Sequence, residues 1–83
     1  MPSIGGNWEH LASRYIERME GYEDRFKACL MSLVKRVKAR KVPNREWYMP
    51  VRDGKNVVGY ICGQGTYVST VLGMDMSPHG EKI

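Results

Sequence analysis

The chain has 83 residues, 42% hydrophobic and 27% charged, which is the composition of one small folded domain and excludes a disordered or membrane-embedded chain. No apolar run approaches the roughly 18 residues of a spanning helix, and the N-terminus lacks the basic start and apolar stretch of a signal peptide. We therefore expect a single cytoplasmic domain over residues 1–83, with no membrane partner.

The net charge of +4 is spread unevenly along the chain. Residues 25–55 hold ten lysines and arginines against two acids, whereas residues 1–24 carry a net of −3 and residues 56–83 a net of −1. A basic segment on an otherwise acidic-to-neutral body favours RNA or another polyanion as partner. The alternative is a solvated helix face that keeps a small protein soluble.

The first elements predicted along the chain are a flexible arm over residues 1–6 and a helix from Asn7 to Glu20. Asn7 is a good N-cap, and Gly21 suits the left-handed residue that ends a helix. Apolar residues recur at helical spacing, which predicts one buried stripe: Trp8, Leu11, Ala12, Tyr15, Ile16 and Met19.

A second helix is predicted from about Glu23 to Arg40, with Pro43 preventing its continuation. Its acidic start and basic end both suit the helix dipole. Its apolar stripe repeats the spacing of the first helix: Phe26, Cys29, Leu30, Leu33, Val34 and Val37.

After Pro43 the pattern changes to strands. Residues 46–52 and 56–62 flank Asp53-Gly54, a strong hairpin signal, and pairing Arg52 with Lys55 would set Met49 opposite Val58 and Trp47 opposite Tyr60. A turn at residues 63–65 leads to a third strand over residues 66–72, whose register stays open. Residues 73–83 read as a tail.

The predicted fold is α+β in two layers, with the two helices of residues 7–41 packed on a three-stranded antiparallel meander within residues 45–72. Pro50 cannot donate to a ladder, so the first strand is predicted at an edge. The oligomeric state is not predicted.

Isolated cysteines, at positions 29 and 62, and the lack of a secretion signal argue against a disulfide. Neither CxxC nor paired-histidine spacing occurs, so no metal site is predicted, and no cofactor is expected. The sequence also lacks a P-loop, a GxSxG motif and a carboxylate pair, which gives little support to nucleotide or serine hydrolysis.

Three features could carry chemistry. The first is His10, Arg14 and Arg18, which are spaced by four along one helix flank. The histidine can transfer a proton, and the neighbouring guanidinium groups can bind phosphate. Exposed arginines paired with neighbouring glutamates are the alternative.

The second feature is a cluster of cations followed by an aromatic residue on the outer face of the sheet, which together suit the phosphates and bases of a single strand. Its predicted nucleic-acid-binding residues are Lys35, Arg36, Lys38, Arg40, Lys41, Arg45 and Tyr48. Trp47, in contrast, is expected in the core.

The third feature is the pair of hydroxyls Ser69 and Thr70 on the last strand, which could hold a phosphate or a substrate hydroxyl. Threonine is also an ordinary strand residue. His79, in the tail, carries no prediction by itself.

The H-x-x-x-R-x-x-x-R helix, the T-Y-V-S-T-V-L strand and the M-D-M-S-P-H-G tail together resemble small toxin-like and phage-encoded proteins. These belong with the metal-independent ribonucleases of the barnase, colicin and RelE-toxin fold. The resemblance implies helices followed by an antiparallel sheet that cradles RNA. It also implies RNA cleavage by a histidine with arginines and a late-strand Thr or Ser, and carries over His10, Arg14 and Thr70.

The leading hypothesis is a phage-type accessory protein that binds nucleic acid, and its catalytic version is a metal-independent ribonuclease of the RelE-toxin type. In it His10 is the general acid/base, Arg14 and Arg18 stabilise the phosphorane, Thr70 completes the catalytic set and residues 35–45 position the backbone. One alternative is a non-catalytic phage protein that binds and inhibits a host bacterial enzyme in the host cytoplasm. The other is a small nucleic-acid binder with no link to catalysis.

Overall fold

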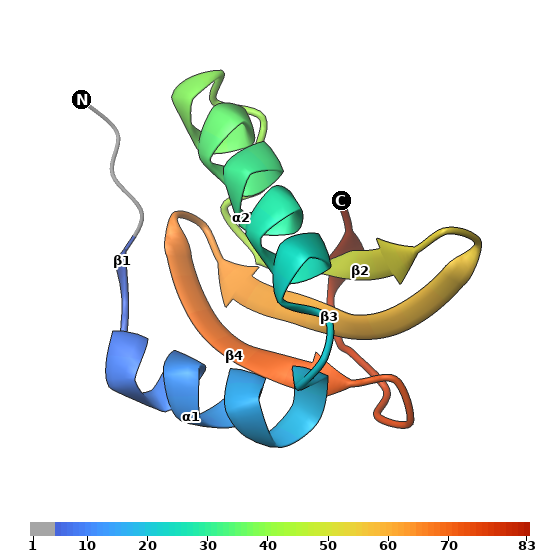
Figure 1. The fold of residues 1–83 in the computed structure, drawn as a ribbon. Helices are drawn as coiled ribbons and strands as arrows, with labels where there is room; N and C mark the ends of the chain where they lie inside the picture. The colour runs from blue at the N-terminus through green and yellow to red at the C-terminus, as the bar shows by residue number, and fades with distance from the viewer. Residues whose placement is uncertain (1–4) are drawn as a thin grey trace.

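The computed structural model describes residues 5–83, which form two helices and a five-stranded sheet (Figure 1). The helices are α1 (Trp8–Met19) and α2 (Glu23–Lys38). The strands are β1 (Gly5–Gly6), β2 (Glu46–Asp53), β3 (Asn56–Gln64), β4 (Tyr67–Gly73) and β5 (Glu81–Lys82). The α+β class is confirmed, whereas the prediction of three antiparallel strands is wrong.

The sheet has the order β1-β4-β3-β2-β5. Strands β2, β3 and β4 form the predicted antiparallel centre, and the additional strands pair in parallel, β1 with β4 and β5 with β2. Each added strand has two residues, too few to show an alternating pattern in the sequence. They form where the long strands β4 and β2 offer backbone groups at their edges.

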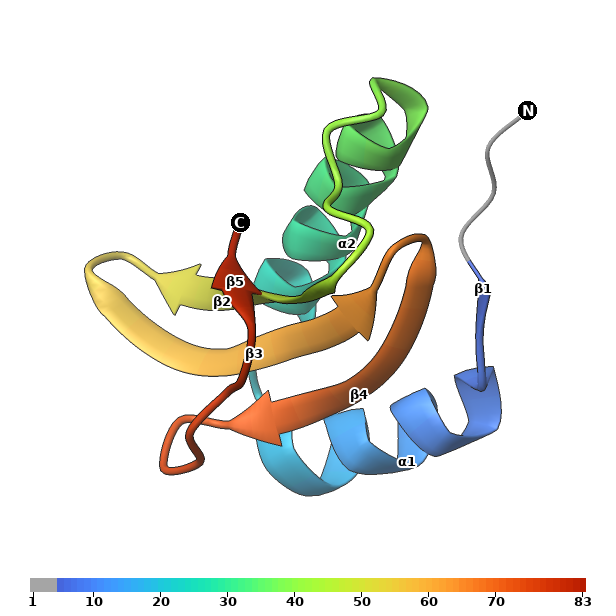
Figure 2. The same ribbon diagram turned by 180° about the vertical axis from the view of Figure 1, so that it is seen from behind.

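These two short strands correct the predicted ends of the domain. Residues 1–4 of the predicted arm lie outside the described residues, but Gly5 and Gly6 pair with Tyr67 and Val68 of β4. The predicted tail is not without structure, because its segment Glu81–Lys82 pairs with Trp47 and Tyr48. To reach β2 from the end of β4, the chain crosses the sheet on the face opposite α2 (Figure 2).

Helix α1 begins as the sequence predicts, with the Asn7 side chain accepting a hydrogen bond from the backbone N–H of His10 (3.1 Å). Gly21 follows the helix with φ of 94°, a left-handed conformation that glycine adopts without strain. The apolar stripe is only partly buried. Leu11 and Met19 lie in the core, whereas Trp8 is 51% and Ile16 62% exposed.

Helix α2 packs against β2 through Leu33 and Val37, which are both buried. Phe26 and Leu30 are partly buried and, with residues of α1, border an apolar cavity of about 190 Å³ over Ile61. The helix ends at Lys38, two residues before its predicted end, and Arg40 takes a left-handed φ of 56°.

The pairing of β2 with β3 differs from the prediction by two residues at the turn, where Asp53 pairs with Asn56 and Arg52 with Val57. Further along β2 it differs by three residues, because Met49 lies opposite Ile61 and Trp47 opposite Gly63. The register shifts at Val51/Arg52, which is the mark of a β-bulge. A one-residue slip moves a side chain to the other face of a sheet.

As a consequence, Tyr60 does not share a face with Trp47, contrary to the predicted pairing of these two residues, and Cys62 lies on the same face as Tyr60. They lie opposite Pro50 and Tyr48 on the face turned away from α2. Gly63 provides the space that Trp47 needs, because a Cβ at that position would lie 2.5 Å from Cζ2 of the indole. The indole Nε1 donates a hydrogen bond to the carbonyl of Gly65 (2.9 Å).

Candidate functional site

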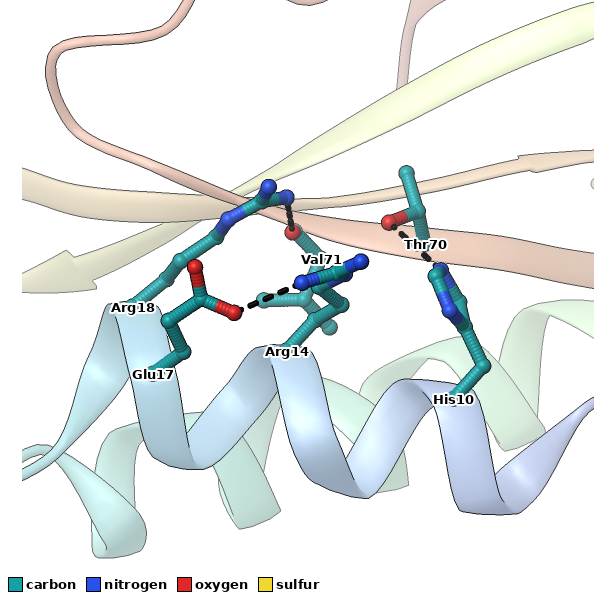
Figure 3. A network of polar contacts seen from close by, with 6 residues as sticks. All are labelled: His10, Arg14, Glu17, Arg18, Thr70 and Val71. Carbon is teal, nitrogen blue, oxygen red and sulfur yellow. Dashed lines mark hydrogen bonds and ion pairs between the residues drawn. The ribbon is translucent and has the colours of Figure 1, made fainter.

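The predicted catalytic residues lie where α1 runs along β4 (Figure 3). His10 comes from the first turns of α1 and Thr70 from the middle of β4, and the two side chains point toward one another. His10 Nε2 lies 3.4 Å from Thr70 Oγ1, and both residues are half-buried. The fold therefore joins two residues 60 positions apart that the sequence analysis placed in one site.

Arg18 makes a different kind of contact. Its Nη1 donates a hydrogen bond of 2.8 Å to the backbone carbonyl of Val71. Strand β1 pairs only with Tyr67 and Val68, so this part of the β4 edge borders α1 instead of a strand. The guanidinium satisfies a carbonyl at that edge, which is a structural role.

Arg14 lies between His10 and Arg18 on the same flank of α1 (Figure 3). Its Nη1 forms an ion pair of 2.7 Å with Oε2 of Glu17, and the two side chains are 37% and 55% exposed. An exposed pair on one helix flank contributes at most about 0.5 kcal/mol. Arg14 can therefore leave Glu17 for a stronger anion at little cost.

A second candidate site is the cationic end of α2 and the turn that follows, which we call the α2 basic end. It consists of Lys35, Arg36, Lys38, Arg40 and Lys41. All are exposed except Arg36, which is half-buried, and none takes part in an ion pair with a residue between 5 and 83. Its charge is thus available to an external anion.

The two other residues predicted for nucleic acid are placed apart from the α2 basic end. Arg45 lies before β2, with Nη2 at 3.8 Å from Oε1 of Glu81 in β5. Tyr48 lies on the predicted outer face, where its ring packs edge-on against Tyr60 with centroids 5.9 Å apart. Its ring is half-buried in this pair instead of standing free for a base.

The structure separates the two candidate sites. Helix α1 packs against β4 and β3, whereas α2 packs against β2, on the other side of β3 in the sheet order. We call His10, Arg14, Arg18 and Thr70 the His10 cluster. Figure 3 shows the side chains of this cluster between α1 and the sheet, with α2 behind α1. The α2 basic end therefore does not supply charge to the His10 cluster directly.

The sequence analysis missed three cations that gather with Arg36 between α2 and the β2–β5 edge: Arg25, Arg52 and Lys82. Arg25 and Arg36 are eleven positions apart, about three helical turns, so the helical period could have placed them on one flank. Arg52 and Lys82 had no such signal, because only strand pairing brings β5 to β2.

Both cysteines are free, and burial raises the pKa of each thiol to about 11. A thiol with so high a pKa is protonated at neutral pH, which makes it a weak nucleophile. These cysteines therefore do not suggest covalent chemistry.

Among residues 5–83, no helix combines the length and the apolar character that crossing a membrane requires. Within the same range, no three His, Cys, Asp or Glu side chains lie close enough to hold a metal ion together. Comparisons with protein-family models, curated proteins and solved structures find no match to this chain. The resemblance to the barnase, colicin and RelE fold thus stays a prediction.

Proposed function

We propose that the protein binds RNA and cleaves it at the His10–Thr70 site without a metal ion. The observation that supports this most is the 3.4 Å contact between His10 Nε2 and Thr70 Oγ1, beside Arg14. An imidazole, a hydroxyl and a guanidinium are a sufficient set for attack by a ribose 2′-hydroxyl on the adjacent phosphate.

In this reaction His10 is the general base. Its unprotonated ring nitrogen takes the proton of the 2′-hydroxyl as the 2′-oxygen attacks phosphorus, and the bond from phosphorus to the 5′-oxygen breaks. The products are a 2′,3′-cyclic phosphate and a 5′-hydroxyl, whose proton comes from water. In-line attack puts the entering and leaving oxygens on opposite sides of phosphorus, so a single imidazole serves only one of them directly.

Thr70 and Arg14 assist this step in different ways. The Thr70 hydroxyl contacts Nε2 and so orients the ring, or it donates to a phosphate oxygen when RNA displaces that contact. Arg14, released from its exposed pair with Glu17, stabilises the charge that develops on the phosphorane. Arg18 is bonded to the Val71 carbonyl, and we assign it to the structure of the edge instead of to the reaction.

The α2 basic end supplies affinity in this proposal. Its cations attract the RNA backbone and release counterions, an effect that does not depend on sequence and falls as salt rises. Because the α2 basic end lies toward the other edge of the sheet, it binds parts of the RNA that are distant from the scissile phosphate. Binding and cleavage should therefore respond to different substitutions.

The test is RNA cleavage at neutral pH in the presence of a chelator, by the wild-type protein and two histidine variants. We expect His10→Ala to lower the rate by at least about 100-fold, the usual contribution of a general base, with RNA affinity unchanged. His79→Ala is the matched control, because His79 is exposed and lies outside the cluster, and it should cleave like the wild type.

No cleavage by the wild-type protein at high concentration would overturn the catalytic part of the proposal. Salt-dependent binding of RNA without cleavage would then leave a non-catalytic nucleic-acid binder. A protein that neither cleaves nor binds RNA would overturn both parts.

A further inference from the structure

A groove lies between α2 and the edge formed by β2 and β5, and we call it the α2–β2 groove. It has a volume of about 380 Å³ and is lined by Arg25, Ala28, Cys29, Ser32, Arg36, Met49, Pro50, Arg52, Lys82 and Ile83. The lining combines four cations with apolar side chains and one hydroxyl. These cations come from three separate elements, α2, β2 and β5.

Three of these cations are free to meet a ligand. Within residues 5–83, Arg36, Arg52 and Lys82 take part in no ion pair. Arg25 is paired with Asp53, its Nε lying 3.1 Å from Oδ1. That pair neutralises one positive charge and leaves three that no acid of the described chain compensates.

The wall of the groove is apolar where α2 meets β2. Met49 is buried, and Cys29 and Pro50 are partly buried and joined by a weak contact of 3.8 Å from the thiol to the Pro50 carbonyl. Pockets for small ligands typically combine such an apolar wall with a few charged groups, and volumes of about 300–1,000 Å³ are usual. The volume of the groove falls within this range.

The groove is continuous with the α2 basic end, because Arg36 belongs to both. A nucleic-acid strand whose phosphates contact Lys35, Lys38 or Lys41 can thus extend into the groove along α2. The charge of the groove favours a phosphate, and its apolar wall favours the sugar or base attached to that phosphate.

From these contacts we infer that the α2–β2 groove binds one nucleotide unit of a nucleic-acid strand. Arg36 reaches the phosphate from α2. Arg52 and Lys82 start from the sheet face of Tyr48 and reach the phosphate round the β2–β5 edge, and Met49 contacts the base or sugar. Because the groove is treated as part of a surface that binds a nucleic-acid strand, the inference rests on the proposed nucleic-acid binding. It does not rest on cleavage. The phosphate is either a terminal phosphomonoester or an internal phosphodiester.

The experiment measures binding of adenosine 5′-monophosphate, of adenosine and of single-stranded DNA oligonucleotides with and without a 5′-phosphate. DNA lacks the 2′-hydroxyl and is not cleaved. The variant Arg52→Ala/Lys82→Ala is compared with the wild type and with Lys55→Ala, an exposed cation outside the groove. Circular dichroism and thermal unfolding check that each variant is folded.

We expect the wild type to bind the nucleotide but not adenosine. The double variant should lose at least about 10-fold in affinity for the nucleotide, as expected for lost charge-assisted hydrogen bonds, and Lys55→Ala less than about 2-fold. Tighter binding of the 5′-phosphorylated oligonucleotide identifies the phosphate as terminal, and equal binding identifies it as internal. Both results support the inference.

Other outcomes separate the groove from the proposed function. Oligonucleotide binding that depends on Lys38 and Lys41 but not on Arg52 or Lys82 would overturn the groove and retain the nucleic-acid binding. Binding of the nucleotide in the groove without any binding of RNA or DNA would overturn the proposed function and, with it, the assignment of the groove to a nucleic-acid strand. Binding of neither would overturn both.

Discussion

The two edges of this sheet use their charged residues in opposite ways. Along β4, Arg14 and Arg18 have partners within the protein, a glutamate and a backbone carbonyl, and His10 contacts Thr70. Beside β2, the α2 basic end and most cations of the α2–β2 groove have no acidic partner among residues 5–83. The β4 edge is organised by internal bonds, whereas the β2 side presents charge to an external anion.

This difference shows why a count of charged residues is a poor guide to a site. Arg18 and Lys38 are both cations on helices, but one is bonded to the sheet and the other is exposed. The energetic consequences differ as well. A satisfied edge carbonyl contributes to the free energy of unfolding, whereas an exposed, unpaired cation contributes almost nothing to it and much to the binding of a polyanion.

The largest effect is expected at the centre of the sheet, on which both edges depend. Gly63→Ala should lower the free energy of unfolding by about 3 kcal/mol or more, because the added Cβ would overlap the Trp47 ring and the Tyr67 carbonyl. Urea denaturation measures the change. Thr66→Ala, in the exposed turn nearby, is the control and should change it by less than about 0.5 kcal/mol. A stable Gly63→Ala protein would show that Trp47 can move aside.

The next effect concerns the thiols. Burial raises the pKa of Cys29 and Cys62 from 9.0 to about 11, so at pH 8 the thiolate is about 100-fold scarcer in the folded than in the unfolded chain. Alkylation by iodoacetamide should be slower in the folded protein by about that factor. Between pH 9 and 11 the unfolded chain ionises first, so the free energy of unfolding should fall.

Alkylation also tests whether a ligand occupies the α2–β2 groove. Cys29 lines the α2–β2 groove and Cys62 does not, so a nucleotide in the groove should protect Cys29 further and leave Cys62 unchanged. Equal protection of both thiols would indicate a general stabilisation instead of occupancy of the groove.

A smaller effect is expected from the α2 basic end. Lys38→Ala/Lys41→Ala should weaken binding of single-stranded RNA by about 10-fold at low salt, and reduce the slope of log K against log salt by about 1.4, or 0.7 for each lost phosphate contact. Fluorescence anisotropy over a salt series measures both. The control with the same charge change, Lys27→Ala/Lys55→Ala, lies outside this surface. An equal loss in both variants would mean that only total charge matters.

The smallest effect compares two arginines of the β4 edge. Arg18→Ala should lower the free energy of unfolding by about 1.5 kcal/mol, because it leaves the Val71 carbonyl without its charged donor. Arg14→Ala should cost less than about 0.5 kcal/mol, because it removes only an exposed ion pair. Urea denaturation of the two variants measures the difference. Equal losses would contradict the structural role that we assign to Arg18.

The regular elements could be predicted from the sequence, but their pairing could not. Both helices carry an apolar stripe and a recognisable start or end, and Asp53-Gly54 marks the hairpin. The register between β2 and β3 depends on the bulge at Val51/Arg52, and no feature of the sequence predicted that bulge. Strands β1 and β5 have two residues each, so no periodicity could reveal them.

The candidate sites divide in the same way. The sequence proposed His10 from its helical spacing with Arg14 and Arg18, and Thr70 as a hydroxyl on the last strand. The resemblance joined His10 and Thr70 in one site, and charge alone indicated the α2 basic end. Whether His10 and Thr70 meet, and whether Arg18 faces solvent or the sheet, depended on how α1 lies along β4.

The sequence by itself determined the α+β class, the two amphipathic helices and the concentration of positive charge in residues 25–55, because local periodicity and composition encode these properties. Only the tertiary structure decided which charges are paired within the protein and which converge on a groove. Those outcomes depend on contacts between parts of the protein that are distant in the chain, such as Arg18 with Val71, or α2 with β2 and β5. Such contacts are set by packing and strand order, to which no local pattern in the sequence corresponds.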